Sequence, residues 1–393
     1  MDLDFEFHPG EALPETALRR LREVGPVVWS DSLAGWLVTA GEEVRRVLGD
    51  VTRFTSAGTP VAETFSGEGM LVDDTPMHHT LRGVWTKSVS AAAMKARIEE
   101  LSGFAASALD TVEPRLRAGE TVDFIPVFRE FVMNFIAASF AVPRDQLDIF
   151  QRWSEMSADT PALAMEAGSE AQLRHAATKA EVEELIRSEV ADRKSRMANG
   201  EQPTDLVSLM VAAEGQHGIT ATKVADNLFN FILGAMDTTE KWIGNIVVRL
   251  CSEPGLRAEV AVDPGLIEPL ADEVMRCDTV AQVIQRRVRE DGTPLGDKKL
   301  AAGDTLYVML GAANRDPAIF TDPDRFDPQR RQGPNFGFGF GFHHCLGINI
   351  ARAEVVAFIA MLLKRPAVKV VNADFGKSWA LLGPRRLELA FAD

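Results

Sequence analysis

Residues 335–354, NFGFGFGFHHCLGINIARAE, decide how this chain is interpreted. Glycines at positions 337, 339 and 341 let the backbone turn tightly and approach a flat partner closely. Cys345 follows them, and residues 346–364 then have the pattern of a helix. The sulfur is therefore expected at a helix N-terminus, where amide groups and the helix dipole favour a thiolate. A soft anionic sulfur in an apolar, aromatic-lined loop suits an iron ligand.

The same residues allow other interpretations. A single cysteine is most often a small buried apolar residue. His343, His344 and Cys345 in succession also permit a zinc site or a Cys/His nucleophile, but the spaced pairs of ligands typical of zinc are missing. An iron ligand is the preferred interpretation of Cys345, and a buried structural cysteine, a zinc site and a Cys/His nucleophile stay open as alternatives.

The composition is that of an ordinary folded protein. The 393 residues are 46% hydrophobic and 25% charged, and no Gly/Ser-rich or Pro-rich linker divides them, so a single domain over residues 1–393 is expected. The net charge of −15 argues against nucleic-acid binding, which depends on clustered Lys and Arg. The longest apolar run, residues 355–363, is far shorter than a membrane-spanning helix requires. No membrane attachment is expected.

The cysteines and the first residues bear on location. Cysteines stand only at 251, 277 and 345, an odd and widely spaced set that does not resemble a disulfide framework, so a reducing compartment is expected. Residues 1–10 are acidic and lack the basic and apolar regions of a signal peptide. The sequence therefore predicts a soluble, cytoplasmic protein.

Hydrophobic periodicity predicts a mainly α fold with minor β structure. Short apolar runs between turn signals indicate a small β-rich lobe in about residues 1–71. From about residue 78 to 250, apolar residues recur at helical spacing. Strand-like patterns return at residues 282–288, 305–310 and 387–391.

A second informative segment is the apolar helix pattern of residues 220–250, whose middle reads LGAMDTT at 233–239. A mid-helix Gly costs about 1 kcal/mol relative to Ala. Burial of an Asp in an apolar stretch is more unfavourable than a mid-helix Gly unless the carboxylate has a partner. Gly234 and Thr238 lie four residues apart and share a helix face, so the helix can approach a planar group there. The alternative is a packing glycine beside an exposed acid.

The Cys345 loop resembles the signature of the cytochrome P-450 family, Phe-x-x-Gly-x-His/Arg-x-Cys-x-Gly, met in full by Phe338, Gly341, His343, Cys345 and Gly347. The resemblance implies the fold of that family, a triangular α-rich body with a small β-rich lobe. It also makes Cys345 the proximal ligand of haem b, with a thiolate that favours O–O cleavage, and His343 a contact of a haem propionate. No C-x-x-C-H pattern occurs, so the haem is expected to be bound non-covalently.

Residues 234–238 resemble the family's oxygen-activation motif, Ala/Gly-Gly-x-Asp/Glu-Thr, with Ala235 where a second Gly is usual. By this resemblance Gly234 and Ala235 border the haem. Asp237 and Thr238 then deliver protons to the oxygen that the haem activates, as general acid catalysis requires.

Glu273 and Arg276 resemble the family's Glu-x-x-Arg pair, and residues 320–326 (FTDPDRF) resemble its Pro-x-Arg-Phe segment. The resemblance implies that Arg325 completes a buried structural network with this pair. Matches of this kind extend from about residue 74 to 354, which is most of the chain.

Two further matches concern the haem propionates. Residues 74–82 resemble the family's Asp-Pro-Pro-x-His-x-x-x-Arg, and residues 286–291 resemble its Arg-x-Ala-x-x-Asp strand. His78, Arg82 and Arg286 are thus the candidate propionate partners, because charge-assisted bonds from basic side chains to carboxylates are strong.

The substrate pocket is expected on the distal side of the haem. Counting along the helix places Phe231 with Gly234 and Thr238, and the resemblance adds residues 59–72, residues 279–284 and the C-terminal turn. Most of these residues are apolar, which favours a small hydrophobic substrate of terpenoid, steroid, aromatic or polyketide type. Residues 165–175 are unusually polar for a segment that covers a substrate. The candidate pocket residues are Phe231, Gln282, Val283, Leu381 and Leu382.

The reaction implied by the resemblance is insertion of one atom of O2 into the substrate by a monomeric enzyme. The chain has no flavin, nicotinamide or iron–sulfur pattern, so electrons are expected from a ferredoxin or flavodoxin with its reductase. Arg82, Lys87 and Arg352 are expected to form a local basic patch for that partner. The alternatives are a peroxide-driven or non-oxygenating haem-thiolate enzyme and a haem-based sensor, both of which the Asp237–Thr238 pair disfavours.

Overall fold

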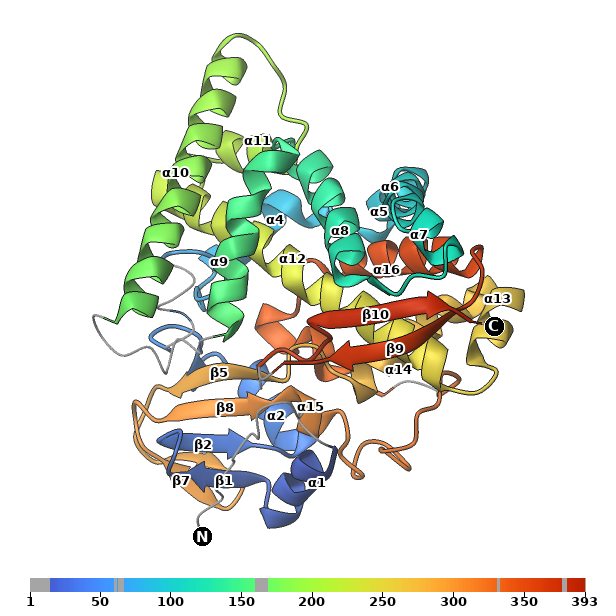
Figure 1. Cartoon of the computed structure of the whole chain (residues 1–393). Helices are drawn as coiled ribbons and strands as arrows, with labels where there is room; N and C mark the ends of the chain where they lie inside the picture. The colour runs from blue at the N-terminus through green and yellow to red at the C-terminus, as the bar shows by residue number, and fades with distance from the viewer. Residues whose placement is uncertain are drawn as a thin grey trace.

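The computed structural model describes residues 15–59, 62, 67–159, 169–330, 333–376 and 380–392. Helices form an α-rich body of roughly triangular outline, and a small sheet occupies one corner of it (Figure 1). This mainly α architecture with minor sheet confirms the predicted fold class. The longer helices are α4 (Met77–Thr86), α6 (Ile98–Asp110), α8 (Ile125–Phe140), α9 (Asp148–Asp159), α10 (Glu170–Ala198), α12 (Ala221–Ser252), α14 (Ile267–Cys277) and α16 (Ile348–Leu363).

Shorter helices and the strands complete the fold. The helices are α1 (Glu15–Val24), α2 (Gly41–Gly49), α5 (Ala91–Ala96), α7 (Glu113–Arg117), α11 (Leu206–Ala212), α13 (Leu256–Val262) and α15 (Leu310–Ala313). The strands are β1 (Val27–Ser30), β2 (Gly35–Val38), β3 (Phe54–Thr55), β4 (Val122–Asp123), β5 (Val283–Val288), β6 (Thr293–Leu295), β7 (Lys298–Leu300), β8 (Thr305–Met309), β9 (Val368–Asp374) and β10 (Arg386–Phe391).

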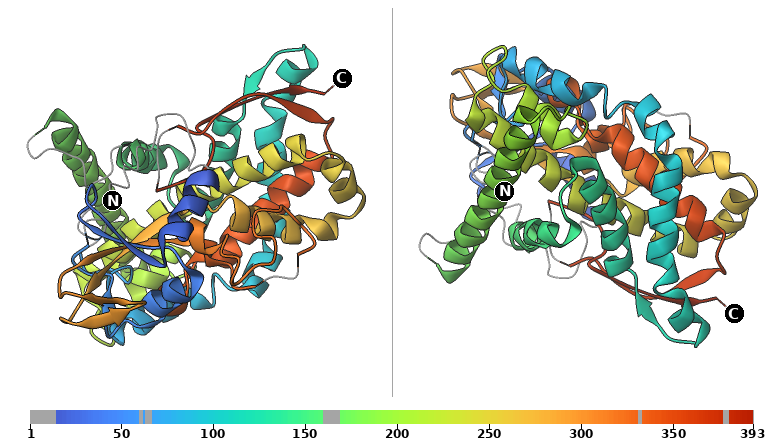
Figure 2. Two further views of the ribbon diagram at one scale, coloured as in Figure 1. Left: turned by 90° about the horizontal axis from the view of Figure 1, so that it is seen from below. Right: turned by 90° about the horizontal axis from the view of Figure 1, so that it is seen from above.

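Helix α12 is the central element of the body and crosses it between the other helices (Figures 1 and 2). It begins after Thr220, whose side chain accepts a hydrogen bond from the backbone N–H of Lys223. It ends at Ser252, shortly before Pro254, which cannot continue a helix. Helices α8, α10, α14 and α16 pack around it, so most of its length is buried and its sequence is correspondingly apolar.

The five-stranded sheet has the order β1-β2-β8-β5-β3. Strand β2 pairs in parallel with β8, with Trp36 opposite Leu306, and β5 pairs antiparallel with both β8 and β3. The observed sheet therefore includes strands from outside residues 1–71, the range predicted for the β-rich lobe. Helices α1 and α2 belong to that stretch, and its sheet is completed by strands more than halfway along the chain, because short strands need several partners to be stable.

The C-terminal strands β9 and β10 form a hairpin to which β4 adds, and this hairpin lies at the periphery, away from the five-stranded sheet (Figure 2). The turn before β10 reaches back to the centre of the molecule. A one-pair bridge joins Leu381 to Ala281, and Asn245 of α12 donates to the carbonyl of Leu382. The turn is thereby fixed beside α12.

The main core lies between α6, α8, α12 and α16 and is rich in aromatic side chains. The ring of Phe358 packs edge-on against Phe128, with 5.3 Å between ring centroids, and lies 5.1 Å from Phe131. Among the described residues, no one helix has both the length and the apolar composition needed to cross a membrane. The bent pair of residues 125–140 and 144–153 meets that test only when its two parts are taken together.

Candidate active site

The loop that carries Cys345 is folded against its own backbone and against α2. The amide of Cys345 donates to the carbonyl of Phe338 at 3.0 Å. Gly341 has a φ of 69°, and a Cβ there would lie 2.6 Å from the carbonyl oxygen of Leu48, so this position requires glycine. A helix follows the cysteine loop, as predicted, and α16 begins at Ile348, two residues after the expected start at residue 346.

Two opposing effects act on the sulfur, and the predicted effect of the helix N-terminus is one of them. Burial raises the pKa of the Cys345 thiol, although the backbone N–H of Gly347, the charge of Arg82 and the backbone N–H of Ile348 act in the opposite direction. The helix terminus alone therefore does not favour the thiolate, because desolvation of a charged sulfur is the larger effect. A coordinated metal deprotonates such a thiol outright. Within the described part of the chain, no three His, Cys, Asp or Glu side chains gather as a zinc site needs.

Asp74 is a contact point that sequence reasoning did not single out. Its carboxylate accepts hydrogen bonds from the Nε2 of His343 at 2.7 Å, from the Thr55 hydroxyl and from the amide of Ser56, and it pairs with Arg289 at 3.0 Å. Burial alone would raise the pKa of Asp74, but the hydrogen bonds from His343 and Thr55 hold it below its ordinary value. The predicted propionate contact, His343, thus lies on a buried carboxylate in this structure.

His78 lies on α4 and uses only one of its ring nitrogens. Its Nδ1 lies 2.9 Å from the carbonyl oxygen of Met70, whereas its Nε2 is buried and has no hydrogen-bond partner in the described parts of the chain. Burial lowers the pKa of His78 to about 4, so the ring is neutral at pH 7. A carboxylate beside Nε2 would raise this pKa and supply the missing partner.

Arg286 is a second buried basic group with an incomplete set of partners. One of its terminal nitrogens donates to the adjacent carbonyl of Gln285 at 2.7 Å, and it forms no ion pair with any residue that the structure describes. Burial lowers the pKa of Arg286 to about 10, against the opposing effect of Asp74. Arg82, by contrast, donates to the carbonyl of His344 at 2.7 Å and acts electrostatically on Cys345. An unpaired buried guanidinium is unfavourable, so the place of Arg286 suits an anion.

Helix α12 has an open position in its middle. A Cβ at Gly234 would meet no atom within 4 Å, and this residue is exposed in the middle of an otherwise buried helix. The cysteine loop itself is half-buried along residues 337–349 except for exposed Gly341. A flat apolar ring with two carboxylates would cover this surface and partner His78 and Arg286. The residues present therefore fit haem.

The oxygen-activation segment has the arrangement predicted from its spacing. The Thr238 hydroxyl donates to the carbonyl of Gly234 at 2.8 Å, which fixes it one turn from the open position. Asp237 is 6% exposed, and its carboxylate lies 3.8 Å from the ammonium group of Lys241, which is equally buried. This i,i+4 ion pair shows how the apolar helix tolerates an acid. Sequence reasoning missed Lys241, although its spacing from Asp237 is a usable signal.

Glu240 is a further buried acid that sequence reasoning missed. It is 3% exposed, and its carboxylate accepts from Nε of Arg129 on α8 at 3.1 Å. Burial raises the pKa of Glu240 to about 7, against the opposing effects of Arg129 and Lys241. Asp237, Glu240 and Lys241 of α12 and Arg129 of α8 therefore form a cluster of four charged side chains.

The predicted Glu-x-x-Arg pair is present and fully buried. Nε of Arg276 lies 2.7 Å from a carboxylate oxygen of Glu273, and neither side chain is exposed. The third member was predicted wrongly. The side chain of Arg325 is exposed, and only its backbone carbonyl accepts a bond from Arg276, at 3.2 Å. Arg330 takes its place, with Nε 3.3 Å from the Glu273 carboxylate.

The error has a simple physical origin. The segment of residues 320–330 contains Pro-x-Arg twice, at residues 323–325 and 328–330, and spacing alone does not distinguish them. The amide of Asp327 donates to the Glu273 carboxylate at 2.9 Å, and this bond turns the chain so that the second arginine reaches the carboxylate.

Three of the predicted pocket residues make contacts within the protein. The Gln282 side chain is buried, donates to the carbonyl of Thr279 and would lie 2.0 Å from a Cβ at Gly311, so it points into the interior. Val283 packs against the apolar cluster beneath α1. Gln282 therefore does not face an open pocket, whereas Val283 is half-buried and remains a prediction.

The ring centroid of Phe231 lies 4.7 Å from that of Trp85 and 5.5 Å from that of Phe140, and the half-buried Phe231 remains a predicted pocket residue. Leu381 and Leu382 are half-buried beside α12 and remain predictions. Of the two predicted covering segments, residues 60–61, 63–66 and 165–168 lie outside the described residues.

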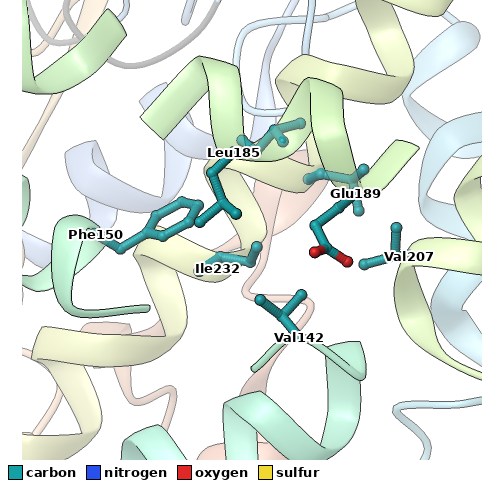
Figure 3. Close-up of a pocket in the computed structure, with 8 residues that line it drawn as sticks. Val142, Phe150, Leu185, Glu189, Val207 and Ile232 are labelled. Atoms are coloured by element: carbon teal, nitrogen blue, oxygen red, sulfur yellow. The ribbon is translucent and has the colours of Figure 1, made fainter. Parts of the chain in front are cut away.

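A small, mostly apolar pocket between α9, α10 and α12 is separate from these groups (Figure 3). The carboxylate of Glu189 points into it, and burial raises the pKa of that carboxyl despite an ion pair with Arg193 at 3.2 Å. None of the predicted site residues lines it. The lining residues are Val142, Phe150, Leu185, Ile186, Glu189, Val207, Leu228 and Ile232.

The cysteine loop, the open glycine face of α12 and the basic groups around them define a haem protein of mainly α fold. Comparisons with known proteins agree. The cytochrome P-450 family model matches residues 266–377. Mycinamicin IV hydroxylase/epoxidase of Micromonospora griseorubida is 30% identical over 377 residues, covering 91% of this chain and 89% of that protein.

Two further proteins extend the comparison. A 20-oxo-5-O-mycaminosyltylactone 23-monooxygenase of Streptomyces fradiae is 28% identical over 90% of this chain and 82% of its own. The crystal structure of a myxobacterial cytochrome P-450 in complex with myristic acid superposes with a TM-score of 0.87, at 25% identity and over 98% of both chains.

The chain belongs to the cytochrome P-450 family. It is a monooxygenase, an oxidoreductase that binds haem b through a cysteine thiolate and uses O2. The predictions of the family, the fold and the reaction class are thereby confirmed. Membership also means that redox partner proteins supply its electrons and that its substrates are hydrophobic.

Proposed function

We propose that this monooxygenase hydroxylates a small, non-ionic hydrophobic compound beside the open face of α12, with Cys345 as the iron ligand. The supporting observation is the position of the Asp237–Thr238 pair next to Gly234, the open position of that helix. The helix and the cysteine loop are neighbours, since a Cβ at Gly347 would lie 3.8 Å from the Phe231 ring and 3.9 Å from the Cys345 sulfur.

The protein's own groups have separate roles in this proposal. When bound, haem supplies the binding and reductive activation of O2. The Thr238 hydroxyl, held by the Gly234 carbonyl, presents an alcohol that passes a proton at its Oγ1. Asp237 returns that proton, and Lys241 keeps its carboxylate in place. His78, Arg82, Arg286 and His343 would hold the haem propionates.

The electron donor is proposed to be a ferredoxin or flavodoxin with its reductase. The expected basic patch is smaller than its three residues suggest. Arg352 pairs with Asp272 at 2.9 Å, and Arg82 is partly buried against the loop of the cysteine, whereas Lys87 is exposed. We further propose a monomer that folds as one domain and works in the cytoplasm. Three free cysteines are consistent with a reducing compartment.

The substrate class rests on two supports. The half-buried Leu381 and Leu382 are apolar and lie beside α12. The named relatives act on mycinamicin IV and on a mycaminosyltylactone, and the superposed structure holds myristic acid. An apolar compound of terpenoid, steroid, aromatic or polyketide type therefore remains the proposal.

Variants of the proton-delivering pair test this function. Asp237→Asn is expected to slow turnover roughly 100-fold, and Thr238→Ala to raise the fraction of reductant recovered as hydrogen peroxide. Ser252→Ala is the matched control, because the Ser252 hydroxyl makes the same bond to the carbonyl four residues earlier, at 2.9 Å, on an exposed part of the same helix. Unchanged peroxide release in Thr238→Ala together with unchanged turnover in Asp237→Asn would refute the assignment.

The iron ligand has its own test. The reduced protein with carbon monoxide should show the red-shifted absorption band of a thiolate complex. Cys345→Ser should lose that band, whereas Cys251→Ser and Cys277→Ser should keep it. A band that survives in Cys345→Ser would exclude Cys345 as the ligand.

A further inference from the structure

Asn230 on α12 has a side chain whose hydrogen-bonding groups are unused. Both its Oδ1 and its Nδ2 are shut off from solvent and have no hydrogen-bond partner among the residues that the structure describes. A buried carboxamide without partners is unfavourable, because it has given up its bonds to water and received none in return. Native proteins contain few such groups, and each calls for an explanation.

Its neighbour Asn227 shows that the helix can satisfy an amide in this region. Oδ1 of Asn227 accepts from the amide of Met70 at 2.9 Å, and its Nδ2 donates to the carbonyl of Lys223 at 2.6 Å. The two asparagines are three residues apart and meet the same chain segment. The lack of hydrogen bonds to the Asn230 carboxamide is therefore specific to its position on the helix.

That position is the boundary between a covered and an open part of one helix face. The covering segment bonds to α12 through the amide of Glu68, which donates to the Asp226 carboxylate at 2.6 Å. A Cβ at Gly69 would lie 2.4 Å from Nδ2 of Asn230, so the segment reaches this residue. One turn later, a Cβ at Gly234 would meet no atom within 4 Å. Asn230, Gly234 and Thr238 are spaced by four and share this face.

We propose that Asn230 is a specificity-determining residue, whose carboxamide binds a hydroxyl or carbonyl oxygen of an otherwise apolar substrate. This inference rests on the proposed function, because it assigns the open face beside Gly234 to the substrate side of the haem. A carboxamide offers one acceptor and two donors, so a hydroxyl can both donate to it and accept from it, which fixes the orientation of the molecule. The preferred substrate is therefore a neutral hydrophobic compound that already carries an oxygen. The reaction that precedes this one must accordingly be one that leaves or installs such an oxygen.

The binding test uses alkylimidazoles, whose ring nitrogen ligates haem iron whatever the natural substrate. Two series are compared from butyl to decyl, one ending in a methyl group and one in a hydroxyl, and binding is followed by the shift of the haem absorption band. In the wild type, the hydroxyl probe is expected to bind at least about tenfold tighter than its methyl counterpart at one chain length. Asn230→Leu should abolish this preference. Asn134→Leu, a part-buried asparagine on α8 that donates to Glu130, should retain it.

An unfolding measurement tests the premise without a ligand. Asn230→Leu should leave the urea midpoint of the protein unchanged or higher, because it removes an unpartnered amide, whereas Asn227→Leu should lower it by breaking two bonds. Equal destabilisation by both variants would overturn the proposal. If no imidazole shifts the haem spectrum, the proposed function fails. If all of them shift it but no chain length favours the hydroxyl in the wild type, only the role of Asn230 fails.

Discussion

Replacement of Arg330 by alanine is expected to be one of the most damaging changes to the supporting structure of the haem site. Its guanidinium pairs with the buried Glu273 at 3.3 Å. It also donates to the carbonyls of Thr321 at 2.6 Å, Asp322 at 3.1 Å and Arg325 at 2.9 Å. The side chain thus ties the loop of residues 321–330 to α14.

The magnitude follows from what the variant leaves behind. Removing one partner of a buried ion pair costs about 3–5 kcal/mol when the other charge is left alone. Glu273 keeps Arg276 at 2.7 Å and the amide of Asp327 at 2.9 Å, and Arg330 is itself 12% exposed. The lower end applies, so Arg330→Ala should lower the free energy of unfolding by about 3 kcal/mol.

Arg325→Ala is the matched control, because its side chain is exposed and alanine retains the backbone carbonyl that Arg276 and Arg330 use. It should cost less than about 0.5 kcal/mol. Urea unfolding of the haem-loaded protein, followed by haem absorption and by far-ultraviolet circular dichroism, measures both variants. If Arg325→Ala proves as destabilising as Arg330→Ala, the assignment of the network is wrong.

Three further predictions concern stability. Glu240→Gln should reduce the pH dependence of the free energy of unfolding. The folded pKa of about 7 lies above the ordinary 4.5, so ionisation of Glu240 destabilises the native state by about 3 kcal/mol as the pH rises through this window. Urea titrations from pH 4 to 8 should show this loss of stability in the wild type and not in the variant. Ala141→Gly should add about 1 kcal/mol, because Ala141 ends α8 with a φ of 51°; a lower melting temperature would contradict this. Gly103→Ala should stabilise the protein by about 1 kcal/mol, since a Cβ there meets nothing within 4 Å. Gly383→Ala should destabilise it by about 2 kcal/mol, since the new Cβ would lie 2.4 Å from that of Lys241. Calorimetry should therefore show changes of opposite sign in the stability of the two variants.

Local spacing carried the parts of the fold and site that were predicted well. The central helix, the helix after Cys345 and the shared helix face of Gly234 and Thr238 each follow from residues within one or two turns of one another. Helical periodicity and glycine placement report such arrangements directly, because backbone geometry fixes them.

Contacts between distant segments were beyond that reasoning. The carboxylate of Asp74 meets His343 across 269 positions of sequence, and nothing in either local pattern announces the contact. Gln282 faces inward because α15 lies against its strand, which the strand's own alternation does not disclose. Arg325 was predicted instead of Arg330 because both follow the same Pro-x-Arg pattern. The hydrogen bond from the Asp327 amide to Glu273, which brings Arg330 to that carboxylate, is not visible in the sequence.

The parallel pairing of β2 with β8 has a consequence for how the protein is made. Trp36 and its partner Leu306 are about 270 residues apart, so a ribosome adding about 5–20 residues per second needs roughly 15–50 s between them. During that interval the β1–β2 hairpin has one edge that nothing synthesised so far can pair, and such edges promote aggregation. Nascent chains of this enzyme should therefore depend on chaperones until translation passes β8, and slower translation should lower the soluble yield.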